Sequence, residues 1–83
     1  MTLYKRYVDV VVLMNTEKQM KPLYMKWIVG NDSKFYKIDK IYEIRRSASV
    51  VGGGGIMFRC RVLNKEIKLY FEVNRWFIES EIP

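Results

Sequence analysis

The stretch "IMFRCRVLNKEIKLYFEV", residues 56–73, carries the clearest structural signal in the chain. Apolar residues alternate with polar ones on both sides of a short polar break, which is the period of a half-buried β-strand. With a turn at Asn64 and Lys65, each inward residue of one strand faces an inward residue of the other. The predicted pairs are Val62 with Ile67, Cys60 with Leu69, Phe58 with Phe71, and Ile56 with Val73. We therefore predict an antiparallel hairpin here.

The residue types on either side of this stretch also favour strands. The chain holds nine valines, eight isoleucines and six tyrosines but a single alanine, so strand formers outweigh the best helix former. Alternation predicts further strands at about 4–14, 22–29 and 34–46, and a short last strand at 76–78. The segment 8–14 is apolar on both faces, which indicates a central strand or one that bends between two layers. A broken pattern near Asp39 and Lys40 predicts a bulge.

Five or six short strands in 83 residues need their edges covered. We expect one all-β domain, residues 1–83, folded as a small half-open antiparallel barrel of the SH3-like or OB-like kind. A flat sheet with a docked short helix is the alternative. Aromatic residues on apolar-patterned faces are expected in the core: Trp27, Phe58, Phe71 and Trp76. Tyrosines that lie among basic residues are expected to be partly exposed: Tyr4, Tyr7, Tyr24 and Tyr70.

Several kinds of chemistry have no support in the residues. The chain has no histidine and one cysteine, which argues against a zinc site and rules out an internal disulfide. Cys60 lies in the apolar alternation and is expected in the core. Ser47 and Ser49 have no base to activate them, so we expect no enzyme, no cofactor and no metal. The longest apolar run, 10–14, is too short to cross a membrane. A lone cysteine without a signal-peptide pattern predicts a cytoplasmic protein.

The charge balance is the first positive hint about partners. Fifteen Lys and Arg residues stand against nine Asp and Glu residues, which gives a net charge of +6. Such a balance on a small domain favours acidic partners such as nucleic acid or another polyanion. Small proteins also carry charges of this size for solubility alone.

Four consecutive glycines, residues 52–55, precede the first strand of the hairpin. A phosphate-binding P-loop would need Lys-Ser or Lys-Thr after Gly55, and a dinucleotide fingerprint would need glycine at Met57. Neither is present. Two interpretations stay open: a flexible connection between strands, or a backbone-amide nest that closes on an anion, with arginines near its base.

The outward face of the predicted hairpin is basic. The register above sets Arg61 opposite Lys68 and Arg59 opposite Tyr70. Like charges in direct opposition destabilise a sheet by up to about 1 kcal/mol, so an anionic partner would relieve the pair, although nearby glutamates could compensate diagonally. Arginine beside tyrosine is also a combination that stacks bases. The predicted anion or nucleic-acid site consists of Arg45, Arg46, Gly53, Gly54, Arg59, Arg61, Lys68 and Tyr70.

Two hypotheses follow from these residues. The first is a non-enzymatic basic module that binds nucleic acid weakly through the arginine-rich hairpin face, with an affinity that falls steeply with salt. The second is a protein-interaction module or homodimer that uses exposed strand edges and the tyrosine-rich first hairpin. The charge supports the first hypothesis, and the apolar first strand supports the second.

Several motifs along the chain resemble those of a group of short uncharacterised bacterial proteins. The segments are "KPLYMKWIVG", "FYKIDKIYEIR", the glycine run and "RWFIE". They give the pattern P-x4-W, Y-x-I-D-K-[IV], a glycine-rich loop and a closing W-F, over roughly residues 20–79. The resemblance implies no activity and no functional residues, because the group has none established. This chain differs from the group mainly in its long glycine run.

Overall fold

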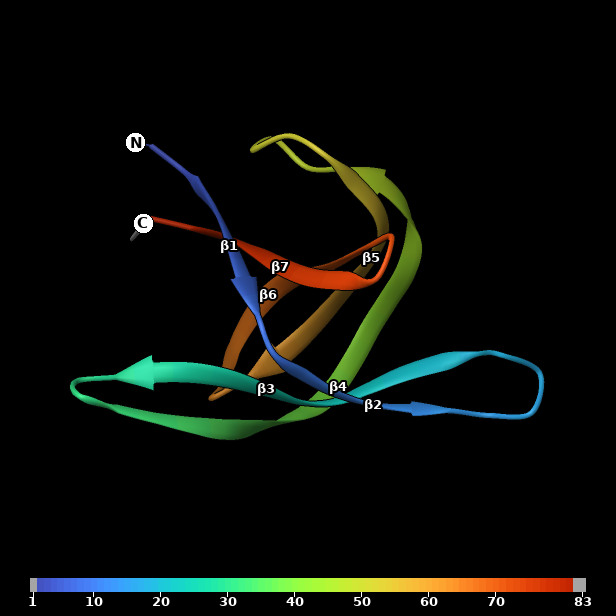
Figure 1. Ribbon diagram of the computed structural model, residues 1–83, viewed down its shortest axis with the longest axis horizontal. Coiled ribbons are helices and arrows are strands. Elements are labelled where there is room, and N and C mark those ends of the chain that lie inside the picture. Colours follow the sequence, from blue (N-terminus) through green and yellow to red (C-terminus); the bar gives the residue numbers. More distant parts are fainter. Residues whose placement is uncertain (1, 82–83) are drawn as a thin grey trace.

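Residues 2–81 form an all-β structure in the computed structural model, with no helix in this part of the chain (Figure 1). The ends of the predicted 1–83 domain, residue 1 and residues 82–83, lie outside the described residues. The strands are β1 (Tyr4–Val8), β2 (Val10–Met14), β3 (Met20–Val29), β4 (Asp32–Ala48), β5 (Gly54–Val62), β6 (Lys65–Glu72) and β7 (Arg75–Ser80). The all-β prediction is confirmed, and the alternative with a docked helix is wrong for these residues.

All strands belong to one curled antiparallel sheet with the order β1-β7-β6-β5-β4-β3-β2. The two edge strands, β1 and β2, are separated in the chain only by Asp9. The sheet must therefore curl until its two edges come near each other, and it forms a half-open barrel (Figure 1). The described residues hold seven strands, where five or six were predicted. The first predicted strand splits at Asp9, because its first half pairs with β7 and its second half with β3.

The long strand β4 joins the two halves of the curl. It pairs with β3 near its start and with β5 along the rest of its length. Its pairing with β5 shifts register between Ile38 and Lys40, and again between Ile41 and Glu43. The predicted bulge near Asp39 and Lys40 is therefore confirmed. Irregularities of this kind bend a strand and increase its twist, and in Figure 1 β4 leaves the flat β3–β4 hairpin and rises into the upper part of the molecule.

The predicted hairpin exists as β5 and β6, but its predicted register is wrong by two residues. The observed partners are Ile56 with Phe71, Phe58 with Leu69, Cys60 with Ile67, and Val62 with Lys65. The turn consists of Leu63 and Asn64, with φ of 52° and 61°. Two consecutive residues at positive φ match the twist of the flanking strands in a two-residue hairpin. A slip of two residues leaves the side chains within the strands on their predicted faces, but Val73, predicted to face inward, lies beyond the end of β6 and is 88 % exposed.

The main core fills the concave side of the curl. Its buried members are Met25, Ile38, Phe58, Cys60, Val62, Leu69, Trp76 and Ile78. Trp27 and Phe71 are partly buried and pack against this cluster, so the predicted aromatic core is confirmed. Cys60 is a free, fully buried thiol whose burial raises its pKa to about 11. The interpretation of Cys60 as a core residue is confirmed as well.

A second, smaller cluster lies on the opposite, convex face of the sheet. It consists of Met57, Tyr70 and Phe77, with Val51 packed against it. The rings of Tyr70 and Phe77 stack in parallel with their centres 5.0 Å apart. Tyr70 is only 2 % exposed, so its predicted exposure is wrong. The strand pattern alone gives no sign that a loop folds over this face and covers Tyr70.

The other three tyrosines behave as predicted. Tyr4, Tyr7 and Tyr24 are 39 %, 44 % and 42 % exposed. They lie on β1 and β3. Tyr7 also contacts the edge of the Phe77 ring, with 6.1 Å between ring centres.

Candidate functional site

The predicted basic residues of the hairpin gather on the convex face of β4, β5 and β6. Arg59 is directly opposite Lys68 on β6 and Glu43 on β4, and Arg61 is opposite Glu66. The predicted opposition of Arg61 with Lys68, and of Arg59 with Tyr70, is wrong because of the register. Residues directly opposed in a sheet share a face. Arg45 therefore lies on this face opposite Met57, whereas Arg46 lies on the other face opposite Ile56.

Carboxylates accompany the arginines of this face. Arg59 Nη1 donates a hydrogen bond to Glu66 Oε1 at 2.8 Å, and its Nε lies 3.5 Å from Glu43 Oε1. Arg61 Nε donates to Asp39 Oδ1 at 2.8 Å. These hydrogen bonds raise the pKa values of both arginines. The face therefore already carries its own counter-charges, and an external anion would have to compete with them. Anion binding at these arginines stays a prediction.

The glycine-rich loop is fastened to the sheet. Within it, Ser49 N–H donates to Gly53 O at 2.9 Å and Gly52 N–H donates to Ser49 O at 3.1 Å. The Ser49 hydroxyl donates to Glu79 Oε2 at 3.0 Å, and Val50 N–H donates to the same oxygen at 3.1 Å. The loop thus holds a carboxylate, but that carboxylate belongs to strand β7 of the same chain. It is a structural tether over the convex cluster.

Removing this tether is expected to loosen the loop. In Glu79→Ala the Ser49 hydroxyl and the Val50 N–H lose their shared acceptor, which costs roughly 1–2 kcal/mol. Hydrogen exchange at Val50 should accelerate, and the midpoint of denaturant unfolding should fall. Glu81→Ala is the matched control, because Glu81 is exposed and should leave both measurements unchanged. Equal exchange rates in the two variants would show that Glu79 does not anchor the loop.

The convex side of β3 and the start of β4 carry a second candidate surface, which we call the aromatic–lysine face: Tyr24, Lys26, Phe35 and Lys37. Tyr24 is directly opposite Lys37, and Lys26 is directly opposite Phe35. Tyr24 is 42 % and Phe35 is 50 % exposed. Lys26 Nζ lies 5.9 Å from the centre of the Phe35 ring. Aromatic and cationic side chains therefore alternate both along the strands and across them.

Little negative charge opposes the lysines near this face. Residues 20–38 hold four lysines and one acidic residue, Asp32, which gives this ribbon a net charge of +3. Lys26 lies 3.8 Å from Asp9, and both side chains are well exposed. Among the described residues, Lys37 of this face has no ion-pair partner. The lysines here are less neutralised by nearby carboxylates than the arginines on the convex face of β4, β5 and β6, which we call the arginine-bearing face.

The sequence interpretation missed the aromatic–lysine face. Its four residues come from two separate segments, and only the register of the β3–β4 hairpin brings them together. A signal was present in the repeated aromatic-x-Lys spacing, Tyr24-x-Lys26 and Phe35-x-Lys37, on either side of the turn at residues 30–31. Such spacing places both side chains on one face of a strand.

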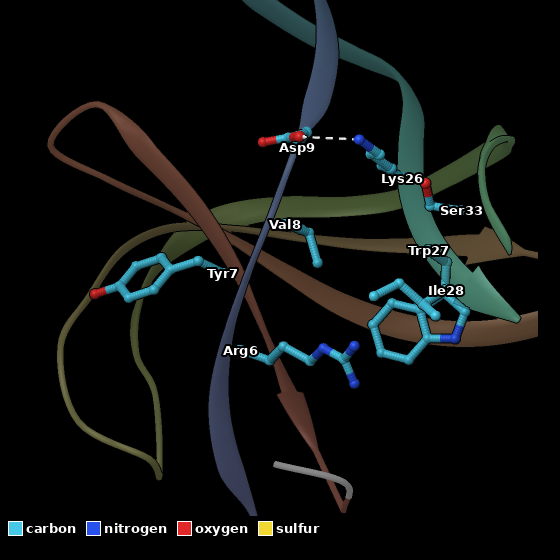
Figure 2. A pocket seen from close by; sticks show the side chains of 8 residues that line it. All are labelled: Arg6, Tyr7, Val8, Asp9, Lys26, Trp27, Ile28 and Ser33. Carbon is cyan, nitrogen blue, oxygen red and sulfur yellow. Dashed lines mark ion pairs between the residues drawn. The ribbon is translucent and has the colours of Figure 1, made fainter. Parts of the chain in front are cut away.

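A pocket of about 260 Å³ opens between β1 and the end of β3, and we call this gap the seam (Figure 2). The Arg6 side chain points from β1 toward Trp27 on β3, with its guanidinium carbon 4.5 Å from the centre of the Trp27 ring. The Asp9–Lys26 ion pair lies at one end of the pocket, as the dashed line in Figure 2 shows. The seam is the place where the barrel fails to close.

The part of the chain that the structure describes contains no cluster of three or more acidic, histidine or cysteine residues able to hold a metal ion. None of its segments is a helix long and apolar enough to cross a membrane. Comparison with known protein-family models, curated proteins and solved structures finds no match. The resemblance to a group of short bacterial proteins therefore stays a prediction, and functional inference rests on this chain's own geometry.

Proposed function

We propose that this protein is a small, non-enzymatic binding module for single-stranded nucleic acid, acting in the cytoplasm through the aromatic–lysine face. The observation that carries the proposal is the alternation of exposed Tyr24 and Phe35 with Lys26 and Lys37 on one sheet surface. Non-specific single-strand sites combine aromatic stacking platforms with cations that follow the backbone. The face supplies both kinds of group at neighbouring positions.

The arrangement suits two successive bases. Tyr24 and Phe35 are diagonal neighbours across β3 and β4, a relation that separates residues by about 7–8 Å. Lys26 and Lys37 form the other diagonal and can each contact a phosphate. Stacking on rings is tolerant of sequence because every base has a π-face. The proposal therefore expects binding with little sequence preference.

The proposal also includes a choice between the two barrel types, OB-like and SH3-like. We regard the half-open barrel as OB-like rather than SH3-like in its use, since OB-folds bind oligonucleotides on one exposed face of their strands. This support is an analogy between folds. The arginines of the arginine-bearing face, with Lys68, would then give the nucleic-acid backbone a second, weaker binding path.

Truncating one platform residue tests the proposal. Phe35→Ala is expected to weaken binding of a fluorescent mixed-sequence 12-nucleotide DNA about tenfold, because base stacking on an aromatic ring is worth about 1–3 kcal/mol. Fluorescence anisotropy at low salt measures the affinity, and an RNA of the same sequence extends the test. Lys37→Gln should reduce the salt slope by about 0.7, the contribution of one phosphate on a single strand.

Tyr42→Ala is the matched control. Tyr42 is 38 % exposed and lies beside Arg59, whose guanidinium carbon is 5.1 Å from the ring centre. The same kind of truncation on the arginine-bearing face should leave affinity unchanged. If Tyr42→Ala weakens binding and Phe35→Ala does not, the arginine-bearing face is the site. If the wild-type protein binds neither DNA nor RNA at low salt, the proposed function is wrong.

A further inference from the structure

Strand β3 loses a neighbour halfway along its length. Its pairing with β2 ends at Met25, which is opposite Val10. One further hydrogen bond follows, from Lys26 N–H to Asp9 O at 2.9 Å. The chain before Asp9 then leaves β3, and β1 pairs with β7 instead. From Lys26 to its end, β3 therefore has β4 on one side and the seam on the other.

Backbone groups of β3 point into this gap. Because Lys26 N–H bonds to Asp9, it faces away from β4. Strand backbones alternate with a period of two residues, so the N–H and C=O of Ile28 face the seam as well. No strand among residues 2–81 pairs with this part of the edge. An unpaired edge of this kind is a template for another extended segment.

The side chains at the seam indicate the chemistry of that segment. The Arg6 guanidinium lies against the Trp27 ring, and among the described residues no carboxylate is within ion-pair distance of Arg6. A guanidinium that stacks on an aromatic face keeps its N–H groups free at its rim, and their planar fork matches a carboxylate. Lys26, at the end of the pocket, is only loosely held by Asp9 at 3.8 Å.

We propose that the seam binds an extended acidic segment of a partner protein. The segment pairs its backbone with β3 at Ile28 and places an aspartate or glutamate carboxylate on Arg6. Strand addition of this kind takes affinity from main-chain hydrogen bonds and specificity from side-chain pockets. The segment would occupy the position beside β3 that β2 leaves empty. It would therefore fill part of the gap between β3 and β1.

A second copy of this chain fits the seam less well. Its free sheet edges are β1, with the sequence YKRYV, β2, with the sequence VVVLM, and the unpaired end of β3, with the sequence KWIV. None of these edges contains a carboxylate, and both β1 and the end of β3 would bring further positive charge to Arg6. Charge complementarity therefore favours a partner of different sequence.

The test uses a blocked seven-residue peptide of alternating valine and threonine with a central glutamate, and a matched peptide with central glutamine. In amide NMR titrations of the whole protein, the glutamate peptide should shift the backbone amides of Lys26 and Ile28 and the indole N–H of Trp27. It should bind about tenfold more tightly than the glutamine peptide, because hydrogen bonds between charged groups are about twice as strong as neutral ones.

Arg6 variants isolate the charge recognition. In Arg6→Gln the two peptides should bind equally, which a double-mutant cycle expresses as a coupling between Arg6 and the glutamate. Arg6→Lys keeps the charge without the planar fork and should retain part of the preference. An unchanged spread of amide signals shows that each variant is folded. The proposal is overturned if the wild-type protein binds both peptides equally, if neither binds at millimolar concentration, or if the shifts map to β2.

Discussion

Gly54→Ala is expected to destabilise the protein strongly. Gly54 has a φ of +143°, and a Cβ at this position would lie 2.5 Å from Ser47 O and 2.7 Å from Ala48 Cα. Both atoms belong to the backbone of β4, which is paired with β5 at this point, so neither can move aside cheaply. Strain and overpacking together cost about 3 kcal/mol or more. That is a large share of the roughly 5 kcal/mol that stabilises a small domain.

Gly52→Ala is the control for that variant. Gly52 also has a positive φ, +93°, but no atom lies within 4 Å of the Cβ position. Only the backbone cost remains, on the order of 1 kcal/mol. Urea denaturation followed by circular dichroism should therefore show a slightly lowered unfolding midpoint for Gly52→Ala and a much lower midpoint for Gly54→Ala. Equal stabilities would mean that the loop backbone adapts freely and that glycine is not required where β5 begins.

The second large effect is expected at Phe77. Its side chain is fully buried, stacks on Tyr70 at 5.0 Å, and is covered by Lys5, whose Nζ lies 4.5 Å from the ring centre. Phe77→Ala removes the central ring of the convex cluster and should cost about 3–5 kcal/mol. The cluster on which Val51 packs then keeps only Met57 and Tyr70. Denaturant unfolding followed by tryptophan fluorescence measures the loss.

Phe35→Ala makes the same chemical change at an exposed position. Phe35 is 50 % exposed, so its truncation should change stability by less than about 0.5 kcal/mol. The two phenylalanines thus separate two roles: Phe77 is required for folding, and Phe35 is proposed to contact the ligand. A large loss of stability in Phe35→Ala would mean that the aromatic–lysine face is covered in solution.

The strand pattern predicted from sequence was accurate where side-chain alternation is regular. The β5–β6 hairpin, the bulge in β4 and the buried Cys60 could all be predicted from alternation alone. The exact register could not, because it depends on which two residues accept positive φ. Asn64 was a recognisable turn residue, but the choice of Leu63 over Lys65 as its partner comes from the twist of the whole sheet.

The glycine run could be recognised but not interpreted. From sequence it is either slack or a nest for an external anion; in the structure the residues before it fasten the loop, because the Ser49 hydroxyl and the Val50 N–H donate to Glu79. A Cβ at Gly53 would displace the ends of the Lys5 and Glu72 side chains, which form an ion pair at 2.8 Å. Those partners lie far from the glycines in sequence, so no local pattern reveals them. For the same reason, no local pattern predicts the burial of Tyr70.

The strand order also bears on how the chain reaches its folded state. Every pairing in the sheet joins strands that are consecutive in sequence, except that of β1 with β7. Five hairpins can therefore form one after another as the chain emerges during synthesis, each by closing a short loop. Strand β1 must wait until Arg75–Ser80 is available, although it is made first. We expect the docking of β1 to be the slowest step of folding. Until β1 docks, it does not cover the Phe77 side of the sheet.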